Sequence, residues 1–369
     1  MFGWTEAFPG DGRTRDGSRS VLLALQAALP AALPPRTGVV GALGRLALIP
    51  VGLLLGLLFL LVFSLLLGPS SLLAQSPGTV AAACHGGQGD RVQGCTLGAA
   101  TAHAFQSGFG LLLGAGGPFP ASPNTAGQRL HGSPRFLFDA GLATASFTHP
   151  DMTSSGAPER RRTVMAPRLA VGVGVFEGVS PAPTVGGVGA VDLLGEVRFL
   201  PVPAFDGLDG RTWSLGAGAR IGVMRESFSL PGLTLSAMHR RSGALEYLSS
   251  GGGAPAVAVT PRVTSFRAVL GKDLMEIGVS GGVQQDRIRG EARVRPGPGA
   301  AGIGSAGSGT IPVDRTTWFV GVNRTWVVSQ IALELGWSPA PSAPEGIPPA
   351  VFGGSAGGIS GALTFRIRY

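Results

Sequence analysis

From Pro134 to the C-terminus, apolar side chains recur at every second position, with small or polar side chains between them. The stretch from Leu169 to Val175 shows this most simply, because Leu and Val alternate there with Ala and Gly. Similar runs occupy residues 213–223, 275–284 and 330–337. Successive side chains of a strand point to opposite faces, so each run predicts a strand with one apolar face. The 61 glycines among 369 residues disfavour long helices and agree with an all-β fold.

Ten such strands are predicted, at residues 134–148, 164–176, 185–200, 212–224, 233–245, 262–272, 275–292, 315–325, 327–338 and 357–369. Their connections alternate between long and short. The long ones are 149–163, 201–211, 246–261, 293–314 and 339–356. Long loops on one side and short turns on the other are typical of barrels in outer membranes. We therefore predict an antiparallel transmembrane β-barrel of about ten strands (roughly eight to twelve) over residues 134–369.

Aromatic residues at the strand ends fit this prediction, although aromatic residues favour strands in general. Two girdles at the membrane interfaces would use them. They are Trp213, Trp318 and Trp337 at loop ends, and Phe136, Trp326 and Tyr369 at turn ends.

The final strand has its own pattern, in which four apolar residues alternate with Thr364, Arg366 and Arg368. The four are Leu363, Phe365, Ile367 and Tyr369. This ending resembles the assembly signal of bacterial outer-membrane β-barrel proteins. The alternating pattern extends the resemblance over residues 134–369, but only the last nine residues are specific to these proteins. The resemblance does not identify a subfamily. It implies insertion by the barrel-assembly machinery into the outer membrane of a Gram-negative-type bacterium, with outer-membrane lipids as partners.

Residues 46–67 form the one long uncharged apolar run, which follows Arg36 and Arg45. A basic, then apolar, then small-residue order is typical of a secretory signal. We predict that residues 1–74 are a leader cleaved after Ala74, with Ala83 as the second choice. The run is long enough to remain as an uncleaved anchor. A weak lipoprotein-like box at Ala81–Cys84 leaves acylation of Cys84 as a further alternative.

Residues 75–133 are predicted to be a periplasmic segment. It contains a short helix at 97–113 and a turn-rich linker at 114–133. The helix is predicted to precede the barrel, with a plug or a periplasmic cap as the alternative. Cys84 and Cys95 are spaced too widely for CxxC redox chemistry and are too few for a zinc site. In an oxidising compartment the two cysteines are predicted to form a short-loop disulfide, and the alternative is two free thiols.

Ionisable residues recur on the face that would line the lumen, and both signs of charge are present. They are Asp139, Asp192, Glu196, Arg198, Arg220, Arg240, Arg267, Glu276, Asp286, Glu334 and Arg366, with Arg368 at the end. A barrel of this size has a narrow interior, so a hydrogen-bonded polar core is the first interpretation. A narrow pore whose charges select solutes is the second.

The functional prediction is a narrow porin-like or structural envelope protein. The alternatives are a barrel hydrolase acting at the extracellular loops, for which His149 and Asp151 are candidates, and a secreted all-β binding domain. No catalytic residue, metal site or cofactor is predicted. The basic residues are scattered, which excludes a nucleic-acid surface. The Glu159–Arg162 stretch would bind lipid phosphates or lie solvated in a loop. The oligomeric state is unknown.

Overall fold

The computed structural model describes residues 75–86, 92–127, 133–152, 159–180, 186–201, 208–209, 211–247, 256–296, 306–349, 351–352 and 357–369. All of them belong to one compact unit, Leu55–Tyr369. The predicted leader, residues 1–74, lies outside the described residues.

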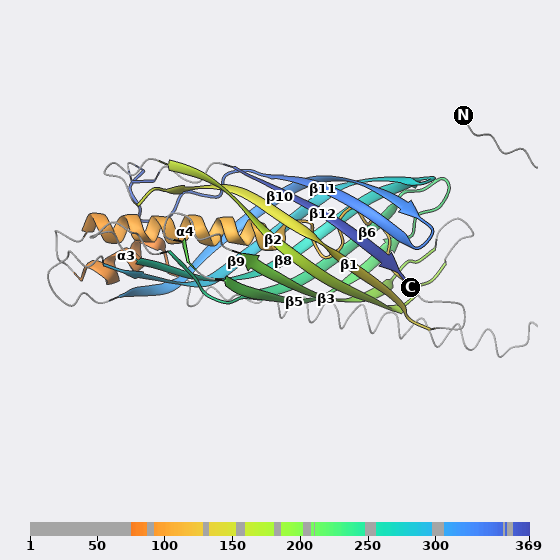
Figure 1. Ribbon diagram of the computed structural model, residues 1–369, viewed down its shortest axis with the longest axis horizontal. Coiled ribbons are helices and arrows are strands. Elements are labelled where there is room, and N and C mark those ends of the chain that lie inside the picture. Colours follow the sequence, from red (N-terminus) through yellow and green to blue (C-terminus); the bar gives the residue numbers. More distant parts are fainter. Residues whose placement is uncertain are drawn as a thin grey trace, which may run out of the picture. The chain divides into compact units, whose positions relative to one another are not determined.

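Ten long strands form a closed antiparallel barrel (Figure 1). They are β1 (Arg135–Pro150), β2 (Glu159–Phe176), β3 (Ala190–Pro201), β5 (Arg211–Met224), β6 (Gly232–Ser242), β8 (Ala256–Leu274), β9 (Ile277–Arg295), β10 (Gly307–Trp326), β11 (Ser329–Ser338) and β12 (Gly358–Arg368). Each long strand pairs with the next one along the chain, and the short strands β4 (Leu208–Asp209) and β7 (Leu245–Tyr247) extend the wall at one end. The predicted all-β antiparallel barrel of about ten strands is confirmed.

The first and last strands close the ring. β1 pairs with β12 from Leu137 opposite Arg368 to Ser146 opposite Ile359. Beyond this register, Phe136 and Tyr369 exchange backbone hydrogen bonds of 3.0 and 2.9 Å. Every backbone group along this seam therefore finds a partner, which is what a sheet surrounded by hydrocarbon requires.

The two ends of the barrel differ in their connections. One end, here called the loop end, has connections 151–158, 202–210, 243–255, 296–306 and 339–357. The other, the turn end, has connections 177–189, 225–231, 275–276 and 327–328 and carries the C-terminus. The predicted contrast in length holds except for the first pair. β2 begins five residues earlier than predicted and shortens its loop, whereas 177–189 is longer than predicted.

The outer surface divides the barrel wall into two halves. The turn half reaches from the turn end up to the row of residues that contains Val283, Trp318 and Trp337, and the loop half is the rest. In the turn half, exposed Leu, Val, Ile and aromatic side chains cover the outside. In the loop half the outward positions carry charge, as at Arg287, Arg289, Glu291 and Arg293 of β9.

The interior shows the reverse distribution. In the loop half, inward residues such as Val263, Ile288 and Val294 belong to a buried apolar cluster. In the turn half, the inward positions carry arginines, carboxylates and amides. The inward parity does not change along a strand, so the two faces exchange polarity halfway along the same pleat.

In the described part of the chain, two helices precede the strands. α3 (Pro77–His85) lies at the loop end, where Gly78 N–H donates to the carbonyl of Glu345. α4 (Val92–Gly114) runs lengthwise inside the barrel and contacts β1, β8 and β9 (Figure 1). The disulfide Cys84–Cys95 joins the two helices, so the predicted disulfide is confirmed and the thiol of Cys84 is not free for acylation.

The position of α4 corrects one prediction. A helix that merely precedes the barrel is wrong, because every residue from Gly98 to Gly114 is buried within the wall. The plug, which the sequence left as the alternative, is what the structure shows. Among the described residues, neither helix combines the length and the apolarity needed to cross a bilayer.

Candidate functional site

The loop half of the lumen is filled by α4. Phe105 and Phe109 pack against Phe147 of β1, with ring centroids 6.3 and 5.7 Å apart. Gly108 makes this approach possible, because a Cβ at that position would overlap the ring of Phe147. A helix satisfies its own backbone hydrogen bonds, so it can occupy an apolar interior without polar partners from the wall.

The last turn of α4 ends among side chains of the barrel wall. Arg198 donates to the carbonyls of Leu112 at 2.6 Å and Ala115 at 3.0 Å, and Gln284 donates to that of Gly114 at 3.0 Å. The final carbonyls of a helix have no intrahelical donor and carry its negative dipole end. Arg198 and Gln284 therefore cap this helix from the wall, at the level where the interior becomes polar.

Beyond the helix, residues 115–127, here called the strap, thread the turn half of the lumen. The strap carbonyls accept from the wall: Arg168 donates to Gly117 at 2.8 Å, Arg366 to Pro120 at 2.9 Å, and Asn323 to Ala121 at 3.0 Å. Prolines 118, 120 and 123 supply carbonyls but no N–H, which suits a wall rich in donors.

Two strap N–H groups find carboxylates. Ala121 N–H donates to Glu334 at 3.1 Å, and Ala126 N–H donates to Asp192 at 2.9 Å. The Phe119 ring is covered on its faces by Arg220 and Arg366, whose guanidinium carbons lie 5.2 and 5.1 Å from its centroid. The strap is thus held through its backbone, the Phe119 ring and the side chains of Ser122 and Asn124, which bond Arg220 and Glu226.

The wall residues also pair with one another. Asp139 binds Arg366 at 3.1 Å and lies 3.5 Å from Arg168. Asp192 binds Arg220 at 2.7 Å. Glu196 pairs with both Arg198 and Arg240, and Glu334 with Arg267. Mutual pairing is what makes buried charges tolerable.

The described lumen contains more cations than anions. Seven buried arginines face five buried carboxylates. The arginines are Arg168, Arg198, Arg220, Arg240, Arg267, Arg315 and Arg366, and the carboxylates are Asp139, Asp192, Glu196, Asp286 and Glu334. Carbonyls of α4 and the strap accept from Arg168, Arg198 and Arg366, and Arg315 donates to the hydroxyl of Ser107 in α4. The wall is therefore complementary to this segment of the chain.

Ten of the eleven residues predicted to line the lumen are buried there, and Arg368 is half-buried and donates to Gln330 at 3.2 Å. Glu276 is a correction. It lies in the exposed two-residue turn Met275–Glu276, where it pairs with Arg324 at 3.2 Å. The turn sits two residues later than the predicted 273–274, and Asp273 takes the inward place beside Asn323.

Sequence reasoning missed five lumen residues, namely Arg168, Gln284, Arg315, Asn323 and Gln330. The signal was present for Arg168, which has the same parity as the inward Ala170, Gly172 and Gly174. Arg315 was hidden because it stands where the predicted strand began. It donates to Ser107 of α4 at 2.7 Å.

His149 and Asp151, the candidates for a hydrolase, are both buried. The His149 ring packs on Phe105 at 5.0 Å and its Nδ1 lies 2.7 Å from the carbonyl of Pro150. Asp151 binds Arg160 at 2.7 Å. Arg161, from the same basic stretch, donates to Ser146 at 2.9 Å. These contacts anchor the loop end of β1 and β2 and do not form an open site.

Comparison with known proteins finds similarity of structure only. No family model matches the chain. No curated protein matches it either. Structural neighbours are outer-membrane β-barrel proteins. The translocator domain of the autotransporter NalP from Neisseria meningitidis has a TM-score of 0.36 at 11% identity and covers 63% of this chain and 88% of its own.

Two further neighbours are an outer membrane channel from Pseudomonas putida F1 and the outer membrane protease OmpT from Escherichia coli. The channel has a TM-score of 0.34 at 10% identity and covers 66% of this chain and 97% of its own. The protease has a TM-score of 0.33 at 10% identity and covers 67% and 99%. Scores this low carry no argument about function.

Proposed function

We propose that this chain is an outer-membrane β-barrel protein with a structural envelope role, closed by its own N-terminal segment. The apolar outer surface of the turn half supports the membrane location, because soluble proteins rarely expose a continuous apolar belt. In β10 the belt runs from Trp318 to Trp326, nine residues, which is the length of a membrane-crossing strand. Trp213, Trp318 and Trp337 are each more than half exposed at its upper edge. A secreted soluble domain has no use for such a belt.

The orientation follows from the ends. Barrels of this kind keep short turns inside and longer loops outside. The loop end would then face the exterior, and the charged outer surface of the loop half would stand in water above the membrane. α3 and the disulfide would lie at the cell surface and not in the periplasm.

The position of Gln75 bears on whether the leader is cleaved or retained. Its N–H donates to the carbonyl of Thr310 at 2.9 Å, near the loop end of β10. A retained apolar run at 46–67 would be joined to this exterior end, where it would have no inner membrane to anchor in. This favours removal of residues 1–74 over an uncleaved anchor. N-terminal sequencing of the mature protein should begin at or near Gln75.

The burial of the lumen arginines is the observation that supports a structural role for the barrel. Arg168, Arg198, Arg240 and Arg366 are among the largest fully buried side chains in the described part of the chain. In an open, water-filled pore these guanidinium groups would be accessible to solvent. A porin-like passage would require the strap and α4 to leave.

Conductance in planar bilayers tests this role. We expect the full mature protein to give no steady current and a variant lacking residues 75–127 to give discrete steps. Because the deletion removes part of the core, Arg168→Ala with Arg366→Ala offers a milder way to release the strap and should give intermittent opening. Steady current through the unaltered protein would overturn the closed-barrel role.

Assembly through the C-terminal signal remains part of the proposal. The four apolar residues of the signal, Leu363, Phe365, Ile367 and Tyr369, are exposed on the outside of β12 and its end. We expect Tyr369→Ala to reduce the amount of heat-modifiable protein in the outer-membrane fraction. Deleting 361–369 should abolish it, because the open edge leaves backbone groups unpaired in hydrocarbon. Normal insertion of the deleted chain would refute the assignment.

A further inference from the structure

A row of arginines crosses the outside of three neighbouring strands on the loop side of the apolar belt. Arg241 of β6 lies opposite Arg262 of β8, and Arg262 lies opposite Arg289 of β9. Arg287 is one outward position closer to the belt. Like charges directly opposite one another destabilise a sheet, so this row is costly unless something anionic covers it.

The protein itself supplies little of that negative charge. Asp314 binds Arg289 at 3.1 Å. Arg241 donates to the imidazole Nε2 of His239 at 3.1 Å, and Arg287 lies 6.0 Å from the centroid of the Phe266 ring. Among the described residues, no carboxylate lies within ion-pair distance of Arg241, Arg262 or Arg287. Three exposed guanidinium groups therefore remain without a counter-charge.

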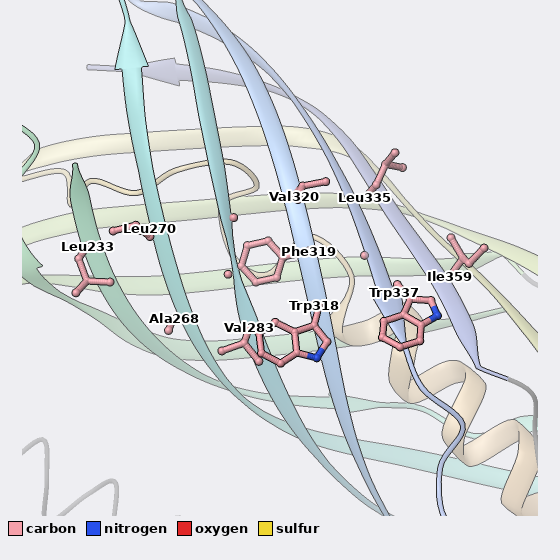
Figure 2. A pocket seen from close by; sticks show the side chains of 13 residues that line it. Leu233, Ala268, Leu270, Val283, Trp318, Phe319, Val320, Leu335, Trp337 and Ile359 are labelled. Atoms are coloured by element: carbon pink, nitrogen blue, oxygen red, sulfur yellow. The ribbon is translucent and has the colours of Figure 1, made fainter. Parts of the chain in front are cut away.

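An apolar hollow lies below this row on the same strands. It has a volume of about 710 Å³ and extends over β6, β8, β9, β10, β11 and the start of β12 (Figure 2). Leu233, Leu270 and Val320 line its part nearer the turn end, and Trp318 and Trp337 stand side by side at its edge nearer the loop end. Gly281 leaves the space open between Leu270 and Val320, its partners across the strands.

The distances suit one amphipathic molecule. Val283, at the loop-side edge of the hollow, and Arg287 are four residues apart on β9, or about 13 Å along the strand, and Ala268 and Arg262 are six residues apart on β8, or about 20 Å. The arginine row spans two strand intervals, or about 10 Å, which is wide for one phosphate and suits two separate phosphates on one head group. Guanidinium groups bind phosphate with two parallel hydrogen bonds.

We propose that this surface binds a phosphorylated glycolipid of the outer leaflet. Its acyl chain would lie in the hollow, and its phosphates would bind Arg241, Arg262 and Arg287. The proposal rests on the proposed function, since the row faces the outer leaflet only if the loop end is outside. A second hollow, near Phe138, Leu169 and Val171, has one exposed outward arginine, Arg211, within six described residues toward the loop end of its strands, and no arginine row, so it would not select two phosphates.

Binding is measured by native mass spectrometry on the full mature protein in a neutral detergent. The probes are a bis-phosphorylated diglucosamine lipid, the same lipid without phosphates, and phosphatidylglycerol. We expect the bis-phosphorylated lipid to bind best. Equal binding of the dephosphorylated lipid would overturn the role of the arginines. Equal binding of phosphatidylglycerol would overturn the assignment to a glycolipid.

Two variants separate head group from chain. The triple variant Arg241→Gln, Arg262→Gln and Arg287→Gln should weaken binding about tenfold or more, since each removes a charge-assisted contact. Gly281→Leu should fill the hollow and reduce binding without changing charge. Its Cβ has room, because the nearest atom, the carbonyl oxygen of Phe319, would be 3.5 Å away.

Arg293→Gln is the matched control. Arg293 is an exposed arginine of the same strand, farther from the belt and already paired with Glu291 at 2.8 Å. It should leave binding unchanged. Heat-modifiable migration verifies that each variant is folded. Loss of binding in Arg293→Gln, or full binding in the triple variant, would refute this site while leaving the membrane location intact. Absence of the protein from the membrane fraction would instead refute the proposed function.

Discussion

The turn half and the loop half of this barrel are built from the same strands, but their apolar side chains lie on opposite faces. In β9, the outward residues are Ile277 and Val279 near the turn and Arg287 and Arg293 near the loop. The inward residues change in the other direction, from Ser280 and Gln284 to Ile288 and Val294. The pleat is continuous, so the surroundings alone decide which face is apolar. In the proposed orientation, lipid surrounds one half and water the other.

The segment inside the barrel changes with its surroundings. In the apolar interior of the loop half it is a helix, whose backbone groups are satisfied internally. In the polar interior of the turn half it is an irregular strap with turns and bends, whose carbonyls need donors from the wall. A helix beside so many arginines would leave them without acceptors, and a strap in the apolar half would leave its own backbone unsatisfied.

The largest expected effect comes from removing a charge inside the turn half. Glu196→Gln leaves Arg198 and Arg240 without their shared carboxylate. Breaking a buried ion pair costs about 3–5 kcal/mol. We expect that loss of unfolding free energy in urea titrations of protein refolded into vesicles.

The control for this change is Glu276→Gln, in the exposed turn, where the pair with Arg324 should contribute about 0–1 kcal/mol. Similar losses for Glu196→Gln and Glu276→Gln would mean that water reaches the lumen. The turn half would then not be the closed interior described above.

A positive charge placed on the outer surface should destabilise the turn half and be tolerated in the loop half. Leu270→Arg places a cation in the apolar belt and should cost about 2–4 kcal/mol. Ala258→Arg, outward on the same strand in the loop half, stands between Glu246 on one neighbouring strand and Arg293 on the other, so it should be close to neutral. The same titration measures both. Equal costs would place the membrane boundary elsewhere on the barrel.

Period-two alternation was enough to predict ten strands and the inward parity of ten lumen residues. It failed where the faces exchange polarity. The strands predicted at 164–176, 262–272 and 315–325 extend at the loop end to Glu159, Ala256 and Gly307. There the outward positions carry charge and the inward ones are apolar. A single apolar face, assumed for the whole strand, could not be followed across that change.

The plug could not be placed from the sequence because its partners are distant in the chain. The helix was predicted at 97–113 and observed at Val92–Gly114, yet nothing local says that Phe147 fits against Gly108. Gly174 shows the same limit. Alternation places it on the lumen face, but cannot show that a Cβ there would overlap the carbonyl of Gly127 in the strap.

The disulfide should matter only in the loop half. Cys84→Ser with Cys95→Ser removes a cross-link over a sequence separation of 11 residues. A closed loop of this length contributes about 2–3 kcal/mol in the chain-entropy description. Hydrogen exchange should become faster in α3 and in the first turns of α4 and stay unchanged in β12. Faster exchange in β12 would show that the two halves unfold together.

The smallest effect concerns a buried histidine of the plug, in the loop half outside the apolar belt. Burial, and then the nearby Arg315, lower the pKa of His103 to about 4, and its Nδ1 has no hydrogen-bond partner among the described residues. The unfolded chain takes up this proton near pH 6.5, whereas the folded chain does so only near pH 4. Stability should therefore be greatest above pH 6.5 and decrease as the pH falls toward 4, with about 2 kcal/mol lost at pH 5.

His103→Leu removes this contribution, so the difference in unfolding free energy between the variant and the unaltered protein should grow by that amount between pH 7 and pH 5. Carboxylates and other histidines titrate in both proteins and cancel in the comparison. A difference that stays constant over this range would mean that the loop half admits water around α4, and its interior would then resemble that of the turn half more than its apolar lining suggests.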